Sequence, residues 1–555
     1  MDDEIRLALA EALQTAATAK SIRTCSRWAA KRRVMGEPFP GKYSWKYHPW
    51  VRDIHDTQAT YNYIMKAAQL GCTEVAINRA FYVLDQLKRD VLYVLPTALN
   101  ASDFAKARFN VALRHSPYLE QMFTNTNAVN LKQTATNSLY IRGSRGDSNL
   151  KSIPVSELIL DETDEMDMKQ VWLALERLSG HLEKHVWALS TPTIPNWGIH
   201  KLFLTSTQEH YFFKAPCCGR RTELVWPDSI KICGETVTDP RCHESYLVCK
   251  ECGATLNHRS KPEWLKGATW EPTAHNGNPD VRGFYINQLY SFTVTPGEIA
   301  VAYFRTFGDE AANKELHNSK LGVPFVGEGA QVTNAMIDEC IGNHTAQDAR
   351  PKLGGERTIV MGVDQGKMCH YVVMEFLVDR FGNDINVASK GKLLAFGKYY
   401  EEDWNVLDNL MREWQVLGCV IDADPQINEA RRFARRFPRY VWLCRYRRGK
   451  TAKEIAISEQ DTLSPMATVD RTNWMSAALG RFKTHRIILP RDISLEFRDH
   501  VKAPVRTYEP DESGNPQATF VSTAQDHLAH ALVYAEIALP LAASVATGQD
   551  IESFL

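Results

Sequence analysis

The chain has 555 residues, enough for about three domains of ~150 residues each. Apolar residues make up 44% of it, yet no apolar run approaches the roughly 18 residues of a membrane span, so a soluble protein without membrane contact is expected. The net charge of -1 excludes a globally basic nucleic-acid-binding protein, so any such surface has to be local. The amino terminus carries no basic-then-apolar signal, so the 12 cysteines are expected to stay reduced and available to metal.

The first 55 residues are expected to form an amino-terminal arm and a lead-in to the first large domain. Within them, residues 23–33 place five basic residues around Trp28. Such a segment is either a docking arm for a partner or DNA, or a solvated helix packed on the main body. The sequence does not choose between the two.

A damaged phosphate-binding loop lies at residues 66–74. The regular loop needs Gly, four residues and then Gly-Lys-Ser/Thr, because bare amides wrap the phosphates, the Lys reaches their oxygens and the hydroxyl holds Mg²⁺. The spacing survives here, with Gly71 and Thr73 in place, but Lys66 stands where the first Gly belongs and Cys72 where the Lys belongs. Either Lys66 supplies the lost charge from the other end of the loop, or the match to the motif is chance.

The elements around the loop fit a nucleotide-binding core. An extended segment at residues 60–65 leads into it, and the apolar spacing predicts a helix over 73–86. A buried parallel strand is expected at 90–96, followed by a helix over 102–113. Strand, loop and helix in this order are the context that a phosphate loop requires.

An apolar strand at residues 157–160 ends in Asp161 and Glu162. In a nucleotide hydrolase the first such carboxylate helps to hold Mg²⁺ and the second polarises the attacking water. A second short strand at 185–189 ends in the hydroxyl-rich residues 190–193. Loop, acidic strand and hydroxyl strand in this order predict a RecA-like ATPase core. The alternative is a strand that simply meets solvent at two acids.

Residues 208–260 form a cysteine-containing insertion of different texture. Cys249 and Cys252 precede a glycine with the spacing of a tight turn that points two thiolates at one Zn²⁺. The other half is weaker, because Cys217 and Cys218 are adjacent and Ala215 stands where a spaced pair would begin. A zinc-ribbon-like segment is predicted, with a ribbon that has lost its metal as the alternative. Beside Cys218, Cys249 and Cys252, the fourth ligand is left open among Cys217, His210, Cys242 and His243.

A further domain is expected over residues 331–535. Asp364 lies in an apolar strand, where an acid has to be satisfied, and a divalent metal does this. Asp422 ends a later apolar strand and Asp526 starts a helix. This order of acids is typical of the RNase H-like nuclease fold, in which two Mg²⁺ or Mn²⁺ ions about 4 Å apart activate water and steady the leaving oxygen of a phosphodiester. For each acid alone, capping or surface exposure is the alternative.

Basic residues interleaved with aromatics follow the second of these acids, and no acid interrupts them. Such a run suits a phosphate backbone and makes binding salt-dependent, whereas the alternative is a solvated helix face. The expected tail, residues 536–555, is a flexible docking peptide or a frayed terminus. The predicted DNA contacts are Arg431, Arg432, Arg435, Arg436, Arg445, Arg447 and Arg448.

The combination resembles the large terminase subunit of tailed bacteriophages, of the GpA type found in lambda-like packaging motors. The likeness runs from about Trp28 to about Ala535. Residues 66–74, Lys-Ala-Ala-Gln-Leu-Gly-Cys-Thr-Glu, are similar to the family's Lys-Ser-Ala-Gln-Val-Gly-Lys-Thr-Glu. The other shared features are Asp161-Glu162, residues 190–193, the Asn-x-x-Leu-Gly-x-Pro string from Asn318 and the Gly-Val-Asp that ends at Asp364.

The resemblance implies an amino-terminal ATPase that pumps double-stranded DNA into procapsids, and a nuclease that cuts concatemeric DNA. It implies that Lys66 and Thr73 bind phosphate and Mg²⁺, that Asp161 supports the metal and that Glu162 is catalytic. The three acids of the second domain would then be the nuclease metal ligands. The implied cofactors are ATP, Mg²⁺ or Mn²⁺, and Zn²⁺. The implied partners are a small terminase subunit, the portal protein and other copies in a ring, in the host bacterial cytoplasm and transiently docked on the portal.

Three departures from the family pattern stand out. The second loop lysine is Cys72. The family's Pro-Tyr-Gln-Arg is here Pro49-Trp50-Val51-Arg52, which keeps an aromatic, Trp50, to stack near adenine but loses the amide that reads its edge. The first zinc knuckle is incomplete.

The predicted fold is therefore α/β: a RecA/P-loop-like ATPase domain over residues 56–330 with a zinc-ribbon-like insertion, followed by an RNase H-like nuclease domain. The predicted function is ATP-driven DNA packaging coupled to a metal-dependent endonuclease. One alternative is a helicase-like ATPase and nuclease of repair or recombination. The other is a zinc-containing DNA-binding or capsid-assembly protein whose ATPase has decayed, with Cys72 as the trace of that decay.

Overall fold

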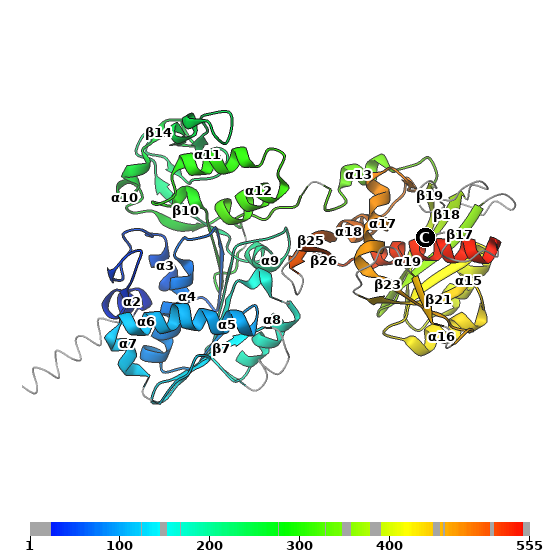
Figure 1. Ribbon diagram of the computed structural model, residues 1–555, viewed down its shortest axis with the longest axis horizontal. Helices are drawn as coiled ribbons and strands as arrows, with labels where there is room; N and C mark the ends of the chain where they lie inside the picture. The colour runs from blue at the N-terminus through cyan, green and yellow to red at the C-terminus, as the bar shows by residue number, and fades with distance from the viewer. Residues whose placement is uncertain are drawn as a thin grey trace, which may run out of the picture. The chain divides into compact units, whose positions relative to one another are not determined.

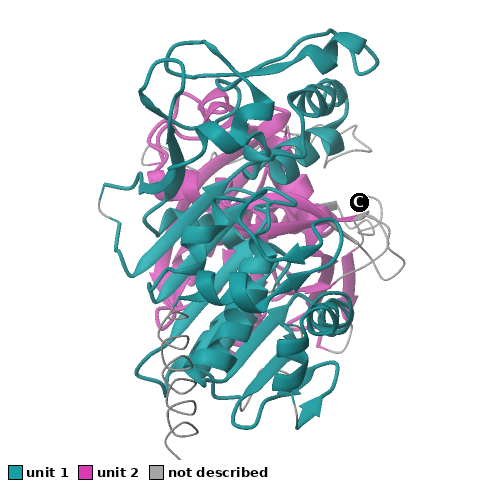
Figure 2. Ribbon diagram, turned by 90° about the vertical axis from the view of Figure 1, so that its left-hand side faces the viewer, with its two compact units in different colours: residues 1–325 teal, residues 326–555 magenta. Residues whose placement is uncertain are grey.

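The computed structural model describes residues 24–123, 125–144, 153–166, 168–275, 277–327, 329–346, 357–377, 390–447, 455–458, 461–510 and 516–547. The chain forms two compact units, Met1–Phe325 (unit 1) and Val326–Leu555 (unit 2), coloured separately in Figure 2. Each unit combines a large sheet with helices, so the predicted α/β class is confirmed (Figure 1).

The amino-terminal helix α2 (Cys25–Arg32) packs on unit 1. Trp28 is fully buried and donates a hydrogen bond from its indole nitrogen to Asp85 (2.7 Å). The hydroxyl of Ser26 donates a hydrogen bond to Oδ2 of Asp56 (2.5 Å). Of the two alternatives for this segment, the packed helix is the one that the structure has; residues 1–23 lie outside the described part. A short helix α3 (Val51–His55) follows.

Unit 1 is built on an 11-stranded sheet in the order β11-β10-β16-β3-β9-β8-β4-β7-β6-β5, with β15 beside β10. Its centre is parallel: β3 (Tyr61–Lys66), β9 (His185–Ser190), β8 (Glu157–Asp161) and β4 (Val91–Leu95) are neighbours in that order. These strands are buried almost throughout, as parallel strands covered on both faces have to be. The strand ending at Ser190 therefore lies between the loop strand and the acidic strand.

The predicted helix after the loop is confirmed as α4 (Cys72–Tyr82), extended by η1 (Val83–Leu87). The predicted helix after β4 is also confirmed, although it begins earlier and runs through three segments that differ in hydrogen bonding. The remaining helices and outer strands up to residue 204 are α5 (Ala98–Phe104), η2 (Ala105–Phe109), α6 (Asn110–His115), α7 (Pro117–Met122), β5 (Thr126–Asn127), β6 (Leu131–Gln133), β7 (Ser138–Gly143), α8 (Met168–Leu175) and α9 (Gly198–Leu204).

The cysteine-containing insertion begins on the main sheet and ends on a small sheet of its own. Strand β10 pairs with β16 of the main sheet and with β11, whereas β12, β13 and β14 form a separate three-stranded sheet. Its elements, and those that complete unit 1, are β10 (Glu209–Lys214), β11 (Arg221–Thr222), β12 (Ile230–Lys231), β13 (Tyr246–Val248), β14 (Thr255–Leu256), α10 (Lys261–Trp264), β15 (Thr269–Pro272), β16 (Val281–Ile286), α11 (Pro296–Arg305), α12 (Glu310–Glu315) and η9 (Leu316–Leu321).

Unit 2 is built on an eight-stranded sheet in the order β22-β23-β21-β20-β17-β18-β19-β24. Strand β17 (Arg357–Asp364) pairs antiparallel with β18 (Met368–Leu377), and β18 pairs antiparallel with β19 (Gly391–Tyr400). Strands β20 (Gly418–Asp422) and β21 (Val441–Arg447) run parallel to β17 on its other side. The flanking elements are α13 (Asn334–Glu339), α15 (Asn405–Glu413), α16 (Ile427–Arg436), β22 (Ile455–Ser458), β23 (Met466–Asp470), α17 (Arg471–Lys483), β24 (Ile487–Ile488), α18 (Leu495–Lys502), and the hairpin of β25 (Pro504–Pro510) and β26 (Pro516–Ser522).

Helix α19 (His527–Thr547) is the core helix of unit 2. A Cβ on Gly362 of β17 would lie 2.0 Å from the carbonyl oxygen of Ala531, so this glycine lets the helix backbone approach the strand closely. The helix is apolar and long enough to cross a membrane, but most of it is buried inside the unit. The tail predicted from residue 536 does not begin there, because α19 continues to Thr547 with Leu539 and Leu541 fully buried. Residues 548–555 lie outside the described part.

Candidate functional site

The loop between β3 and α4 is held by backbone contacts from segments far away in the sequence. Gly71 and Gln69 adopt left-handed φ values of 78° and 60°, and glycine does so without steric cost. The Ala68 amide donates to the carbonyl of Ser319 (2.7 Å), and the Ala67 amide donates to that of Ile286 (2.9 Å). The loop is therefore fixed by tertiary structure at both amides.

Gly322, in the string that begins at Asn318, explains why that string carries a glycine. Its φ is 64°, and a Cβ there would lie 2.6 Å from the Ala67 nitrogen. Any side chain at this position would push against the backbone of the loop. The string is thus a support for the phosphate-loop strand rather than an independent site.

Lys66 is buried and contacts the acidic strand. Its ammonium nitrogen lies 3.3 Å from Oε1 of Glu162, and Ser190 donates to Oε2 of the same carboxylate (3.3 Å). Burial by itself would lower the pKa of Lys66, but the carboxylates of Glu162 and Asp161 outweigh it and raise the pKa. The lysine is therefore charged at neutral pH and is directed at the two predicted acids.

Asp161 is held by a tyrosine that the sequence analysis missed. The buried hydroxyl of Tyr93, on the neighbouring strand β4, donates to Oδ2 of Asp161 (2.6 Å), while Oδ1 is buried without a partner among the described residues. Burial and the Glu162 charge raise the pKa of Asp161 to about 6, and Lys66 and Tyr93 oppose that rise. An oriented carboxylate with one free oxygen fits a Mg²⁺ ligand. Periodicity gave no signal for Tyr93, since its role follows only from strand pairing.

Cys72 does not replace the missing lysine. Its side chain is buried at the start of α4, and the thiol contacts the carbonyl of Leu70 (3.8 Å). Burial raises the pKa of Cys72 to about 12, so the thiol is neutral. A neutral side chain at this position cannot offset phosphate charge. The loop therefore has one cation fewer than a regular phosphate-binding loop with a lysine here.

Trp50 cannot stack on a nucleobase, contrary to the prediction. It is fully buried, and its indole nitrogen donates to the carbonyl of Leu70 in the loop (2.8 Å). Its ring packs edge-on against His48 and Phe292. The resemblance at Pro49–Arg52 therefore concerns a residue that supports the loop from beneath.

Asp164 organises the segment after β9 and was also missed. Its Oδ2 accepts hydrogen bonds from the amide and the hydroxyl of Thr193 (2.6 and 2.7 Å), and Oδ1 accepts from the amide of Ile199 (2.6 Å). Thr193, in the hydroxyl-rich segment that follows β9, is thus bound to an acid. The sequence signal was the third acid of the run that begins at Asp161, which a search for two catalytic carboxylates passes over.

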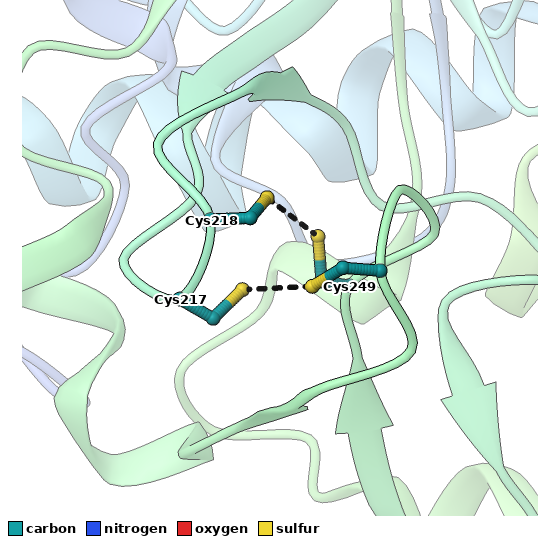
Figure 3. Close-up of side chains that lie close together, drawn as sticks. Cys217, Cys218 and Cys249 are labelled. Atoms are coloured by element: carbon teal, nitrogen blue, oxygen red, sulfur yellow. Dashed lines mark hydrogen bonds between the residues drawn. The ribbon is translucent and has the colours of Figure 1, made fainter.

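The insertion brings four cysteine sulfurs together (Figure 3). The sulfurs of Cys217 and Cys252 lie 3.4 Å apart, and those of Cys218 and Cys249 lie 4.0 Å apart. A tetrahedron with Zn–S bonds of about 2.3 Å has sulfur–sulfur edges of about 3.8 Å, so the set fits one Zn²⁺. Of the four alternatives for the last ligand, Cys217 joins the cluster, whereas His210 bonds to Glu223 (2.6 Å).

The two knuckles have the same backbone geometry, which explains how adjacent cysteines can serve. The amide of Gly219 donates to the carbonyl of Ala215 (2.9 Å), and that of Gly253 donates to the carbonyl of Cys249 (2.8 Å). Ala215 thus occupies the place of Cys249, as the sequence indicated. The side chain of Cys217, two residues later in the same turn, supplies the fourth sulfur instead.

In unit 2 the structure brings two of the three predicted nuclease acids to adjacent strand ends. Val363 pairs with Ile421 in parallel register, so Asp364 and Asp422 both follow at the carboxyl end of the sheet. Burial, together with the charge of Asp364, raises the pKa of Asp422 to about 6. Two acids that repel each other in a partly buried position fit a divalent cation.

Asp526 faces other partners. Its carboxylate lies 3.2 Å from Nε2 of His530 and accepts a hydrogen bond from Ser522. Although burial opposes the shift, these contacts lower the pKa of Asp526 to about 2. Within the described ranges, the tight grouping of three or more ligand atoms is the cysteine set alone, so Asp526 does not close a compact cluster with Asp364 and Asp422.

Histidines lie beside Asp364 and Asp526, and no sequence pattern predicted them. Nδ1 of His527 lies 2.8 Å from Oδ2 of Asp364. Its ring stacks on His370 with centroids 4.7 Å apart, and the ring of His500 lies 5.4 Å from that of His370. Their sequence separation hides this grouping; the residue next to the predicted Asp526 was the one available signal.

The predicted DNA-binding arginines lie on α16 and β21, but acids from elsewhere meet several of them. Arg436 pairs with Asp408 (2.8 Å), Arg435 with Asp461 (3.1 Å) and Arg445 with Asp424 (3.0 Å). Arg432 pairs with Glu429 on its own helix (2.6 Å), while Arg431 is exposed and Arg447 ends β21. The run without acids in sequence is therefore a mixed surface in space; Arg448 lies outside the described residues.

The strand order of unit 1, with the lysine loop and the two acids at the carboxyl ends of central parallel strands, defines an ATPase-type core. Residues 37–270 match the family model for the phage terminase large subunit gpA, ATPase domain. Residues 37–270 of unit 1 therefore match a terminase ATPase domain of the gpA type, and the resemblance inferred from the sequence is confirmed.

Solved structures of large terminases are similar to this chain at low identity. The HK97 bacteriophage large terminase is 10% identical with a TM-score of 0.49, over 92% of this chain and 98% of that one. The ATPase domain of the Thermus phage P74-26 large terminase is 14% identical with a TM-score of 0.30, over 49% and 91%. A large terminase nuclease from a thermophilic phage is 12% identical with a TM-score of 0.21, over 36% and 95%. Among curated proteins no sequence matches.

Proposed function

We propose that this chain is the motor subunit of a DNA packaging machine, in which unit 1 hydrolyses ATP to move double-stranded DNA into a procapsid and unit 2 cuts concatemeric DNA. The observation that carries the proposal is the gpA ATPase match over residues 37–270. Within these residues Lys66 contacts Glu162 at the carboxyl ends of the parallel strands β3, β9 and β8. On this reading the ATPase domain spans residues 56–330 and the nuclease domain residues 331–535.

In the ATPase site each side chain has a separate task. Asp161, oriented by Tyr93, and Thr73, in the first turn of α4, would hold Mg²⁺ through oxygen atoms. Bound Mg²⁺ neutralises phosphate charge. Glu162 would accept a proton from the attacking water, and the ammonium nitrogen of Lys66 lies 3.3 Å from its Oε1. Gly71 leaves the loop open to the phosphates.

In unit 2, Asp364 and Asp422 would hold Mg²⁺ or Mn²⁺ at the end of the sheet, with Asp526 and His527 beside them. The arrangement of β19-β18-β17-β20-β21, antiparallel on one side and parallel on the other, supports an RNase H-like nuclease. Divalent cations there activate water toward phosphodiesters. Exposed arginines of α16 and β21 would supply the local DNA contacts. The proposed partners are the small subunit, the portal protein and further copies in a ring, in the host cytoplasm.

The test is one preparation of the full chain assayed for ATP hydrolysis and for plasmid cutting, each with and without EDTA. We expect ATP hydrolysis that is stimulated by Mg²⁺. We also expect the protein to linearise plasmid, and EDTA to abolish this cutting. Duplex unwinding would support the repair or recombination alternative, and the absence of both ATP binding and cutting would support the decayed-ATPase alternative.

We also propose that the four cysteines of the insertion bind one Zn²⁺. Cys217→Ser should reduce the zinc content measured by elemental analysis, because three thiolates leave a coordination position without a protein ligand. It should also lower the melting temperature, since zinc-binding free energy contributes to folding. Cys233→Ser, at a half-buried cysteine outside the cluster, is the matched control. A zinc-free protein that stays folded with an unchanged melting temperature contradicts the assignment.

A further inference from the structure

The phosphate-binding site of unit 1 lacks a cation that its loop type normally has. Cys72 is neutral and buried where a lysine ordinarily reaches the phosphates. Lys66, the remaining cation of the loop, lies against Glu162. A triphosphate still carries net negative charge when one Mg²⁺ is bound, and proteins offset it with Lys or Arg. A second cation within reach of the site is therefore required.

Arg108 is a cation beside the start of α4. It belongs to η2, and its Nη2 donates to Oε1 of Glu74 (2.8 Å), the residue that follows Thr73. Its side chain is 43% exposed, whereas that of Glu74 is 14% exposed. The guanidinium therefore lies at an open edge of the site rather than in the core.

The charge of Glu74 is met without Arg108. Arg33, whose side chain is 2% exposed, donates from Nη2 to the other carboxylate oxygen of Glu74, and from Nε to Asn78 (2.7 Å). One carboxylate thus meets two guanidinium groups, of which the buried one cannot leave. Arg108 is the more exposed of the two arginines, and Arg33 still pairs with Glu74 when Arg108 leaves.

Arg108 also lies near the predicted magnesium ligand. After burial and the Glu162 charge, which raise the pKa of Asp161, Arg108 is among the groups that oppose the rise, with Lys66 and Tyr93. The same guanidinium packs near the ring of Phe104, 6.0 Å from its centroid. The guanidinium thus contacts Glu74 and Phe104, and its charge acts on Asp161.

We propose that Arg108 binds the terminal phosphate of ATP within the same chain and supplies the positive charge that is lost at Cys72. The proposal rests on the proposed ATPase function of unit 1. Without nucleotide, Arg108 rests on Glu74, where the structure has it; with ATP, a planar guanidinium exchanges that carboxylate for phosphate oxygens, to which it is equally suited. ADP lacks this phosphate and leaves Arg108 on Glu74.

The competing interpretation is that Arg108 only stabilises Glu74 and the first turn of α4. A double-mutant cycle separates the two. Arg108→Gln is made in the natural chain and in Cys72→Lys, which restores the cation in the loop itself. Dissociation constants for ATPγS and ADP are measured with Mg²⁺ present, together with ATP hydrolysis and melting temperature.

Arg108→Gln is expected to weaken ATPγS binding about 10–100-fold, as loss of a charge-assisted contact does, and ADP binding less than about 3-fold. In the Cys72→Lys background the same substitution should cost less than about 5-fold. Arg108→Lys should retain part of the affinity. Arg114→Gln, at an exposed arginine of α6, is the matched control and should change neither constant.

Equal losses for ATPγS and ADP, or equal losses in both backgrounds, overturn the proposal and leave the structural interpretation. Arg108→Lys serves if Arg108→Gln proves to be unfolded by its melting curve, since a merely structural cation would not discriminate between the two nucleotides. If the unaltered chain binds no nucleotide, the proposed ATPase fails as well. If it binds ATPγS and Arg108→Gln leaves that affinity unchanged, this inference alone fails.

Discussion

Two pairs of carboxylates lie at the carboxyl ends of parallel strands, one pair in each unit, and they are neutralised differently. In unit 1, the ammonium nitrogen of Lys66 lies 3.3 Å from Glu162, so a side chain of the protein itself meets the charge of that carboxylate. In unit 2, Asp364 meets His527 (2.8 Å), and Asp422 keeps a pKa of about 6 because it is partly buried beside Asp364. The first site therefore has a resident lysine in addition to the Mg²⁺ that it is proposed to bind, whereas the second is proposed to rely on divalent cations that have to be supplied.

The difference teaches that the same sheet geometry can serve two kinds of phosphate chemistry. A lysine fixed beside one acid suits a site that binds a charged nucleotide and orients one water. Paired acids with imidazole neighbours suit a site in which divalent ions hold the substrate and activate water. Removal of a resident cation and removal of a supplied one should therefore have separable effects on the two activities.

The largest effect is expected from Lys66→Ala. The substitution deletes the resident cation, leaves Glu162 without its ion pair and should lower ATP hydrolysis by about 10²–10³-fold or more, as loss of an electrostatic stabiliser does. Plasmid cutting that is measured without ATP should be unchanged. Lys201→Ala, at an exposed lysine of α9, is the control. Normal hydrolysis by Lys66→Ala would show that the loop is not the nucleotide site.

The reciprocal change is Asp364→Asn in unit 2. Loss of a carboxylate ligand should reduce cutting by more than about 100-fold, above the roughly 10–100-fold that loss of a supporting group costs, while ATP hydrolysis stays within about 2-fold. Cutting is followed at several Mn²⁺ concentrations, since partial recovery at high Mn²⁺ identifies a weakened metal site. Asp403→Asn, an exposed acid near the same sheet, should behave as the unaltered chain. Equal loss of cutting and of ATP hydrolysis would show that the two sites do not act separately.

Gly322→Ala tests how the first site is supported. The new Cβ would lie 2.6 Å from the Ala67 nitrogen at a φ of 64°, so strain of about 1–3 kcal/mol is expected. Because the strain falls on the loop strand, ATP hydrolysis should decline together with the free energy of unfolding of unit 1 in urea. Gly180→Ala, at a glycine with open space around its Cβ position, is the control. An unchanged urea midpoint would show that the segment beginning at Asn318 can shift to accept the new Cβ without loss of stability.

The smallest effect on chemistry is expected from Gly362→Ala, the corresponding change in unit 2. Its Cβ would lie 2.0 Å from the Ala531 carbonyl oxygen, so α19 has to shift and the urea transition of unit 2 should move by about 1–3 kcal/mol. The acids lie at the strand end, beyond this contact, so cutting at low temperature should fall less than 10-fold while ATP hydrolysis stays unchanged. Gly480→Ala, with no atoms near its Cβ position, is the matched control. A larger loss of cutting than of stability would show that α19 positions the acids directly.

Much of the fold followed from local patterns. Continuous apolar runs predicted β4, β8 and β9, because parallel strands covered on both faces leave no polar positions. The glycine spacing and the acidic strand end pointed to the ATPase core, which the gpA match over residues 37–270 supports. The errors arose where burial could not be read from a motif. Trp50 matches the position of a stacking aromatic but is fully buried, and residues 536–547 are small and apolar because they lie in a core helix rather than a tail.

The sequence by itself determined the order of the strands along the chain, the residues at their carboxyl ends and the presence of cysteine knuckles, because these depend on periodicity and spacing. Tertiary structure alone decided which side chains meet. Tyr93 reaches Asp161 through strand pairing, His527 reaches Asp364 through the packing of α19, and Cys217 completes the cysteine cluster through the shape of its turn. Contacts between residues far apart in sequence depend on how sheets and helices pack, and a linear pattern does not carry that information.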